Sequence, residues 1–152
     1  MASPQGYNKD GSVNFKVAIR NKPKQPPTPQ KMNHNPKSIR PFIGAKSFEQ
    51  SRNFYRDIGF EESILSHNMS YFHTKGIGFY LQDAYVEDWI NNTMIFVEVE
   101  DVGRYWNELL ALNLTAKYEN LKLIPIRQLD WGRECFLHDP SGILWHFGEF
   151  FN

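Results

Sequence analysis

The chain has 152 residues, and its 17 lysine and arginine residues balance 17 aspartate and glutamate residues. A formal charge of zero gives no support for a general affinity toward nucleic acid or a membrane surface. No apolar run approaches the roughly 18 residues of a membrane span. With Cys135 as the single cysteine, an internal disulfide and a cysteine-based zinc site are both excluded. We therefore expect a cytoplasmic protein in a reducing compartment.

The first 37 residues differ in composition from the rest of the chain. They hold seven basic residues against one acid, whereas the remaining residues hold 10 basic and 16 acidic ones. Apolar and polar residues alternate over residues 12–20, which predicts a strand, and the proline-rich residues 21–37 predict an extended linker. Two interpretations remain open: a tag or leader, or an interaction arm that pairs with a sheet edge of another chain. Residues 38–152 are expected to form a single domain.

Residues 38–83 predict one strand, one helix and three further strands. Pro41 favours a sheet edge for the first strand. The helix follows Ser47-Phe48-Glu49-Gln50, whose spacing is typical of a capping box, and Gly59 supplies its end. A tight turn at His67-Asn68 separates two of the later strands. The expected ranges are strand 39–45, helix 48–58 and strands 60–65, 69–74 and 77–82.

Residues 93–149 repeat the same order of elements. Asp101 can cap a helix, and Asp139-Pro140-Ser141-Gly142 is typical of a type I turn between the last two strands. The repeat predicts an α+β fold with two tandem βαβββ modules, forming a curved mixed sheet around a cleft with helices on the outer face. The expected ranges are strand 94–99, a helix after Asp101 with the apolar stripe Val102, Tyr105, Trp106, Leu109 and Leu110, and strands 116–119, 133–138 and 143–148.

Two motifs in this order carry a family resemblance. They are Ser51-Arg52-Asn53-Phe54-Tyr55-Arg56-Asp57-Ile58-Gly59-Phe60 and Phe136-Leu137-His138-Asp139-Pro140-Ser141-Gly142-Ile143-Leu144-Trp145. On them, residues 38–149 resemble the vicinal oxygen chelate superfamily, which includes glyoxalase I, extradiol dioxygenases and the fosfomycin- and bleomycin-resistance proteins. The resemblance implies that functional residues point into the cleft from the strands.

Enzymes of this superfamily usually hold a divalent metal with one inward ligand from each of four strands. The resemblance places Arg40, Tyr80, Met94 and His146 at these positions. Only His146 is a good ligand, and an arginine would place a fixed positive charge against the ion. We therefore predict no metal cofactor. A shift of one residue in strand register would instead bring Glu98 and Gln82 inward.

With no metal predicted, the bleomycin-resistance branch is the closer comparison, and its closing strand is similar in carrying His where metal-dependent members carry Glu. The resemblance implies that its members are non-enzymatic dimers that sequester a large, flat, cationic antibiotic. Such a ligand requires aromatic faces and carboxylates. The Arg40 guanidinium suits an anionic group on the ligand, or else a structural ion pair with Glu98 or Glu149. Cys135 is expected to be buried and inert. The predicted ligand-binding residues are Arg40, Tyr80, Tyr85, Trp89, Met94, Trp131 and His146.

These observations favour a metal-free small-molecule-binding protein that sequesters an aromatic or cationic ligand in its cleft and acts as a homodimer. Drug or antibiotic resistance is what the resemblance implies. The alternative is a metal-dependent glyoxalase- or dioxygenase-type enzyme that uses His146 with Glu98 or Gln82 around a divalent ion.

Overall fold

The computed structural model describes residues 34–151, and residues 36–152 belong to one compact unit. The predicted strand 12–20 and residues 21–33 of the predicted linker lie outside the described residues. Residues 34–41 are exposed and have no regular secondary structure.

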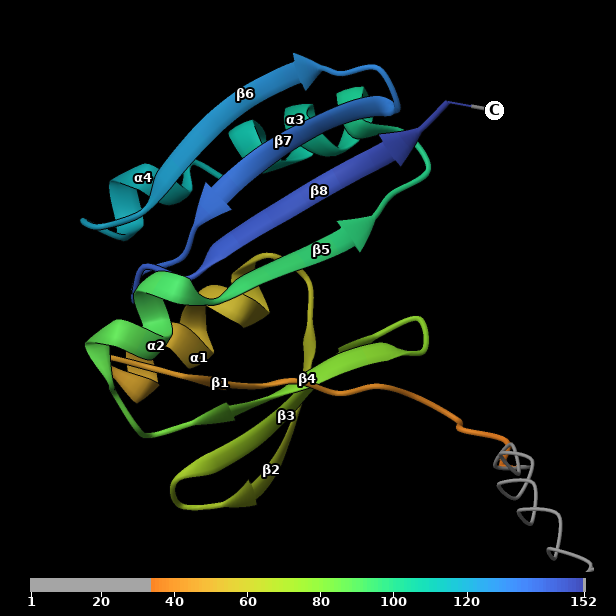
Figure 1. Cartoon of the computed structure of the whole chain (residues 1–152). Coiled ribbons are helices and arrows are strands. Elements are labelled where there is room, and N and C mark those ends of the chain that lie inside the picture. The colour runs from red at the N-terminus through yellow and green to blue at the C-terminus, as the bar shows by residue number, and fades with distance from the viewer. Residues whose placement is uncertain (1–33, 152) are drawn as a thin grey trace, which may run out of the picture. The chain divides into compact units, whose positions relative to one another are not determined.

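The chain folds as two copies of the same order of elements (Figure 1). The first module consists of β1 (Phe42–Gly44), α1 (Phe48–Asp57), β2 (Glu61–Ser66), β3 (Met69–Thr74) and β4 (Ile77–Gln82). Helix α2 (Glu87–Asn92) connects it to the second module. The second module consists of β5 (Met94–Glu98), α3 (Val102–Ala111), α4 (Leu114–Lys117), β6 (Lys122–Gln128), β7 (Gly132–His138) and β8 (Leu144–Phe150).

Each module forms its own four-stranded mixed sheet. The strand orders are β1-β4-β3-β2 and β5-β8-β7-β6, and in each sheet the first strand runs parallel to its neighbour while the others are antiparallel. The predicted α+β fold of two tandem βαβββ modules is therefore confirmed, with two separate sheets that do not close on each other. Strand β1 lies at a sheet edge, as Pro41 predicted.

One face of each sheet is covered by a helix. Helix α1 packs on the first sheet and α3 on the second, and both present apolar side chains to one continuous core. Strand side chains alternate between the two faces of a sheet, and within residues 34–151 no helix packs on the other face of either sheet. Within residues 34–151, no helix is long and apolar enough to cross a membrane.

The core joins the two modules through Tyr55 of α1. Its ring packs against Phe79 of the first sheet and Trp145 of the second, with centroid distances of 4.8 and 5.7 Å. Its hydroxyl donates to the buried Asp139 carboxylate at 2.5 Å. The other Asp139 oxygen accepts hydrogen bonds from the backbone N–H groups of Ser141, Gly142 and Ile143. The predicted turn at residues 139–142 therefore forms, and it anchors the first helix to the second module.

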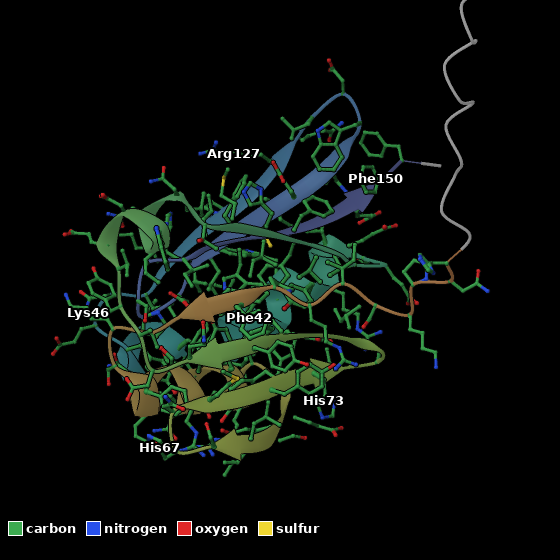
Figure 2. The ribbon with its side chains drawn as sticks, turned by 60° about the horizontal axis from the view of Figure 1, so that its bottom comes forward. Phe42, Lys46, His67, His73, Arg127 and Phe150 are labelled. Carbon is green, nitrogen blue, oxygen red and sulfur yellow. The ribbon has the colours of Figure 1, made fainter. Side chains whose placement is uncertain are left out.

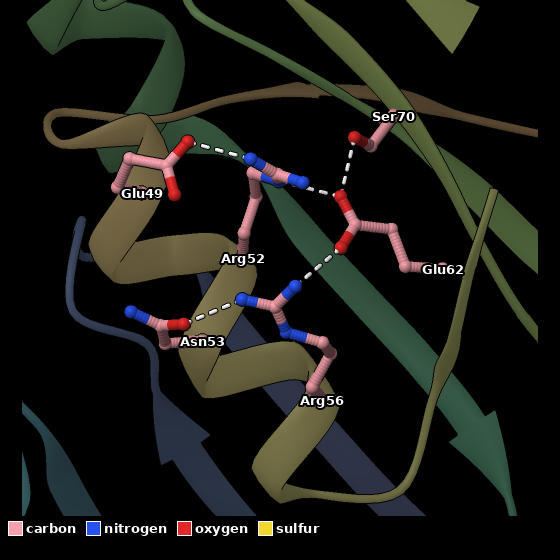
Figure 3. Close-up of polar contacts among 6 residues, drawn as sticks. All are labelled: Glu49, Arg52, Asn53, Arg56, Glu62 and Ser70. Atoms are coloured by element: carbon pink, nitrogen blue, oxygen red, sulfur yellow. Dashed lines mark hydrogen bonds and ion pairs between the residues drawn. The ribbon is translucent and has the colours of Figure 1, made fainter. Parts of the chain in front are cut away.

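A cluster of charged side chains holds α1 on the first sheet (Figure 3). The Glu62 carboxylate accepts hydrogen bonds from Arg52 at 2.5 Å, from Arg56 at 2.8 Å and from Ser70 at 2.6 Å. Only 6% of the Glu62 side chain is exposed. Burial opposes its ionisation, but the hydrogen bonds from Arg52 and Ser70 outweigh burial and lower the pKa of Glu62.

One predicted strand was wrong. Residues 116–119 fall in helix α4 and the loop after it, and the strand lies later, at β6. Asn113 adopts a left-handed conformation, with φ 48°, and starts a second helical turn whose buried side chains are Leu114 and Tyr118. Strand β6 contains Pro125, and its edge position and a nearby bulge accommodate the proline.

Two details at helix ends also differ from the sequence predictions. Ser47 is the N-cap residue of α1, but its side chain makes no capping hydrogen bond, so the predicted capping box does not form. Helix α2 lies in a segment for which no element was predicted. Gly59 ends α1 with φ 96° as predicted, and Asp101 caps α3 by accepting from the Arg104 N–H at 3.0 Å.

Candidate ligand-binding site

The uncovered faces of the two sheets carry the predicted cleft positions. Phe42 of β1 is paired with Tyr80 of β4, and Phe96 of β5 is paired with His146 of β8. Side chains two residues apart share a face, so Arg40 and Met94 belong to the same faces as these pairs. All four strand positions implied by the resemblance therefore lie on uncovered faces.

The uncovered face of the first sheet is a row of aromatic rings with one cation. Phe42 stacks on Tyr80 at 4.6 Å, and Tyr71 contacts Tyr80 at 5.2 Å and stacks on His73 at 5.1 Å (Figure 2). The Arg40 guanidinium lies 4.5 Å above the Tyr71 ring and donates a hydrogen bond to the Tyr80 hydroxyl at 3.3 Å. We call this set of five residues the arginine platform.

A glycine makes room for the arginine platform. A Cβ atom on Gly78 would lie 2.7 Å from the Tyr71 hydroxyl, 2.8 Å from the ring and 2.6 Å from the Phe72 carbonyl oxygen. The Tyr71 ring therefore lies directly over the backbone of β4, at a place where a side chain would displace it. Gly78 therefore leaves the space that the Tyr71 ring occupies below Arg40.

The uncovered face of the second sheet has an acid and an imidazole at its centre. The Glu134 carboxylate lies 3.1 Å from Nδ1 of His146, and only 10% of its side chain is exposed. The Phe136 ring meets the His146 ring edge-on at 4.8 Å, and Arg127 lies 5.3 Å above Phe136. Phe96, Trp131 and Phe150 form a neighbouring group with centroid distances of 5.0 to 6.0 Å (Figure 2). We call these residues the glutamate platform.

The structure brings some predicted site residues together and leaves others apart. Arg40 and Tyr80 are in contact, and Trp131 lies in the glutamate platform with His146. Met94 is on the same face as His146, near the start of β5, and is 67% exposed. Tyr85 precedes α2, where Lys46 lies 5.7 Å from its ring. Trp89 is on α2 and is 73% exposed.

Two details of the predicted cleft are corrected. Glu98 shares its face with Met94 and Phe96, and Gln82 shares its face with Tyr80, so no shift in register is needed to place them there. Glu149 pairs with Arg133 at 2.8 Å and accepts from the Val102 N–H, so it is not the structural partner of Arg40. Cys135 is fully buried as predicted, and burial raises the pKa of its thiol to about 11.

The cavities lie at the junction of the two modules. One of about 280 Å³ is lined by Gly78 of the first uncovered face and by Phe96 and Glu98 of the second. Two others, of about 410 and 460 Å³, lie between the end of α1 and α3, on the helix-covered side, and share Tyr105 and Glu108. The cavity of 280 Å³ therefore lies between β4 and β5, and of the residues in the two platforms only Phe96 lines it.

The donor set on the uncovered faces is poor for a divalent metal. Among residues 34–151, no three histidine, cysteine, aspartate or glutamate side chains are grouped as metal ligands would be. His146 and Glu134 supply two donors, but the two aligned positions in the first module, Arg40 and Tyr80, supply a guanidinium and a phenol. These residues do not fit a four-ligand metal site.

Sequence reasoning missed the central acid of the second face. Glu134 and Phe136 become visible once β7 is paired with β8 through the turn at residues 139–142, because the turn fixes Phe136 opposite His146. The same alternation identifies Phe42 and Tyr71 from Tyr80. The hairpin register was therefore the signal that could have found them.

Comparison with known proteins gives a consistent fold. No family model matches the chain, and no curated protein matches its sequence. Among solved structures, it is similar to the bleomycin-binding protein of Streptomyces verticillus, solved with copper(II)-bleomycin, at 19% identity and a TM-score of 0.62 over 72% of this chain and 93% of that one.

Two further structures extend the comparison to enzymes and resistance proteins. The lactoylglutathione lyase of Agrobacterium tumefaciens gives a TM-score of 0.59 at 18% identity over 76% of this chain and 96% of that one. The fosfomycin resistance protein FosX of Listeria monocytogenes, solved with Mn(II) and sulfate, gives a TM-score of 0.58 at 16% identity over 74% of this chain and 89% of that one. At these identities the comparison establishes the fold and leaves the ligand open. The chain thus shares the fold of these bleomycin-binding, lactoylglutathione lyase and fosfomycin resistance proteins, the fold that the resemblance of its two motifs predicted.

Proposed function

We propose that the protein is a metal-free binding protein that captures a planar aromatic ligand with a cationic group on its uncovered sheet faces. The observation that carries the proposal is the glutamate platform, in which the largely buried Glu134 lies among aromatic rings. Aromatic faces attract a planar cation, and a nearby carboxylate pairs with its charge. The poor donor set for a metal also favours binding without an ion.

The exposed apolar surface supports a homodimeric assembly as part of this proposal. Phe42, Met94, Phe96 and Phe150 are all between 45% and 67% exposed on the uncovered faces. Apolar side chains gathered on a face are typical of a surface that a ligand or a second copy covers. Sedimentation velocity of the full chain measures the mass directly, and a monomer at all concentrations would remove the dimer from the proposal.

Isothermal titration calorimetry with bleomycin tests the ligand class. The titration is made with metal-free and with copper(II)-loaded bleomycin, because a solved protein of this fold holds the copper complex. We expect saturable binding that Glu134→Gln weakens about tenfold, since a buried charge partner is lost. Absence of heat at high micromolar concentrations would reject this ligand class.

Trp131 and Trp89 provide a matched pair of variants. Both side chains are exposed, but Trp131 packs in the glutamate platform and Trp89 lies on α2. We expect Trp131→Ala to weaken binding and Trp89→Ala to weaken it only if α2 contributes to the site. If Trp89→Ala weakened binding and Trp131→Ala did not, the site would not lie on the uncovered faces.

A metal-dependent enzyme of the glyoxalase or dioxygenase type is the second candidate. The contact between His146 and Glu134, on the same face as Glu98, favours it because these are the side chains that hold divalent ions. Elemental analysis of protein purified without chelator decides between the two. A stoichiometric transition metal that is lost in His146→Ala would replace the binding proposal with this one.

A further inference from the structure

We infer that the arginine platform is a binding site for an aromatic carboxylate, so that the ligand carries an anionic group as well as its ring. This inference rests on the proposed function and adds the chemistry of the first sheet to it. Its basis is the geometry around Arg40, Tyr71 and Tyr80.

The orientation of Arg40 is set before any ligand arrives. Its guanidinium carbon lies 4.5 Å from the centre of the Tyr71 ring, and one of its nitrogens donates to the Tyr80 hydroxyl oxygen at 3.3 Å. Stacking and the hydrogen bond restrict the side chain, so less conformational entropy is lost when it binds a ligand. An unrestrained surface arginine lacks this advantage.

Hydrogen-bond donors converge at this point. The Tyr80 oxygen accepts from Arg40, which leaves the phenolic hydrogen of Tyr80 to donate to a ligand. The remaining guanidinium N–H groups of Arg40 are exposed. In the part of the chain that the structure describes, the ion pairs involve other residues, and no carboxylate is paired with Arg40. A carboxylate fits this set because its two oxygens can accept from both side chains.

The neighbouring rings select an aromatic body for the ligand. Phe42 stacks on Tyr80 at 4.6 Å and is 58% exposed, so a ring attached to the carboxylate can lie against it. Gly78 lies under the Tyr71 ring and also lines the cavity of 280 Å³ that leads toward Phe96. A ligand anchored at Arg40 therefore has apolar surface available along the sheet.

The two platforms differ in the charged groups that they present, which distinguishes this inference from the cation site. On the first face Arg40 lies over Tyr71, and Glu61 lies at the far end, 4.0 Å from His73. On the second face the Glu134–His146 pair is at the centre, and Arg127 lies over Phe136. A ligand with a carboxylate should contact the first face even where its cationic group is absent. Probes that differ only in charge can therefore separate the two sites.

The test uses three probes with one ring: naphthalene-2-carboxylate, naphthalene-2-carboxamide and 2-naphthylmethylammonium. Each is titrated into the full chain while amide NMR signals of Gly78 and Tyr80 report on the first face and those of Glu134 and His146 on the second. We expect the carboxylate to shift the first set and to bind about fivefold tighter there than the carboxamide, as an exposed charge pair allows.

Arg40→Gln should remove the fivefold preference without changing the binding of the carboxamide by more than about twofold. Arg104→Gln is the matched control, because it removes the same charge from an exposed arginine on α3, where the partner is Glu108. It should leave the preference intact. Arg40→Lys should retain only part of the preference, since a lysine keeps the charge but not the planar stacking.

The outcomes separate this inference from the proposed function. Equal binding of carboxylate and carboxamide, or a preference that survives in Arg40→Gln, overturns the carboxylate site and leaves an aromatic-binding protein. If none of the three probes shifts either set of signals, both the inference and the proposed function are overturned. Loss of the carboxylate preference in Arg104→Gln as well would assign the effect to net charge and would also overturn the site.

Discussion

The two modules share one order of elements but differ in charge at corresponding places. On the uncovered face, each module presents an arginine over an aromatic ring, Arg40 over Tyr71 and Arg127 over Phe136, but only the second adds the Glu134–His146 pair. In each sheet a ring lies over a strand glycine, Tyr71 over Gly78 and Phe96 over Gly148. The scaffold therefore determines where side chains point, and residue identity at those points determines which part of a ligand each sheet can hold.

The modules also hold their helices in different ways. Helix α1 is tied to its sheet through the largely buried Glu62 carboxylate, and its Tyr55 hydroxyl donates to Asp139 of the other module. Helix α3 is fixed at its first turn, where Asp101 and Glu149 accept backbone N–H groups. The first helix thus depends on buried side-chain contacts, and the second on capping. This difference predicts unequal costs for corresponding substitutions.

The largest expected effect is at the turn between β7 and β8 in the second module. Asp139→Ala leaves the Tyr55 hydroxyl and three backbone N–H groups without their buried acceptor. We expect the free energy of unfolding to fall by about 3 to 5 kcal/mol, because buried polar groups without partners are costly. Urea denaturation followed by tryptophan fluorescence measures it.

The corresponding turn of the first module supplies the control. Lys75 and Gly76 are exposed there and have positive φ angles of 43° and 88°. Lys75→Gly relieves an unfavourable backbone conformation and should change stability by less than about 1 kcal/mol. Similar losses at the two turns would contradict the idea that only the second one anchors the fold.

The next effect concerns the attachment of α1. Glu62→Gln removes the charge that Arg52 and Arg56 share, and we expect a loss of about 2 kcal/mol in the free energy of unfolding. Glu149→Gln is the counterpart in the second module, where the carboxylate is more exposed, and about 1 kcal/mol is expected. Chemical denaturation of both variants at pH 7 compares them, and a larger loss for Glu149→Gln would reverse the comparison.

The pH dependence gives this comparison a second readout. Although burial opposes ionisation, hydrogen bonds from Arg52 and Ser70 lower the pKa of Glu62 from its ordinary value of 4.5. A lowered folded-state pKa means that this stabilisation is fully present above about pH 4.5 and is lost as the pH falls through the lowered value. The stability difference between wild type and Glu62→Gln should therefore shrink in acid. An equal difference at about pH 3 and about pH 7 would contradict an ionised Glu62.

A smaller effect is expected at the two glycines under the platform rings. A Cβ on Gly78 would approach the Phe72 backbone oxygen at 2.6 Å, which cannot move easily, so Gly78→Ala should cost about 1 to 2 kcal/mol. A Cβ on Gly148 would meet the ring of Phe96, which is 45% exposed and can rotate. Gly148→Ala should therefore cost less than about 1 kcal/mol while changing the emission of Trp131. Thermal unfolding measures the loss of stability in both variants, and fluorescence spectra report on Trp131. Equal losses of stability would contradict the prediction, because they would mean that the two rings are equally rigid.

Sequence reasoning succeeded where a local pattern has one physical solution. The turn at residues 139–142 and the helix end at Gly59 each require particular residue types, and both formed as predicted. The repeat of these signals was enough to predict two βαβββ modules. The face of Arg40 and His146 was also predictable, because alternation along a strand is strict once the strand is identified.

It failed where long-range contacts decide the structure. Pro125 argues against a strand, yet β6 forms because an edge position tolerates the missing donor. The pattern predicts a strand at residues 116–119, but Leu114 is buried in a helical turn there, and Tyr118 after the turn donates to Asp57 of the first module. The pairing of Glu134 with His146 depends on hairpin register, which composition does not reveal.

The smallest expected effect concerns reactivity rather than stability, and it tests the alternation that assigns each sheet a core face and an uncovered face. Cys135 of β7 faces the core, and burial raises the pKa of its thiol to about 11. With little thiolate at pH 8 and no access for reagent, it should react with a thiol-specific disulfide reagent at least about 100-fold more slowly than in the unfolded chain. Ser63→Cys adds a thiol on the uncovered side of β2, where residue 63 is exposed. This variant should rapidly release one equivalent of the reagent's thiol per protein chain. Rapid modification of native wild-type protein would mean that β7 has the opposite orientation, and Glu134 and Phe136 would then face the core instead of a ligand.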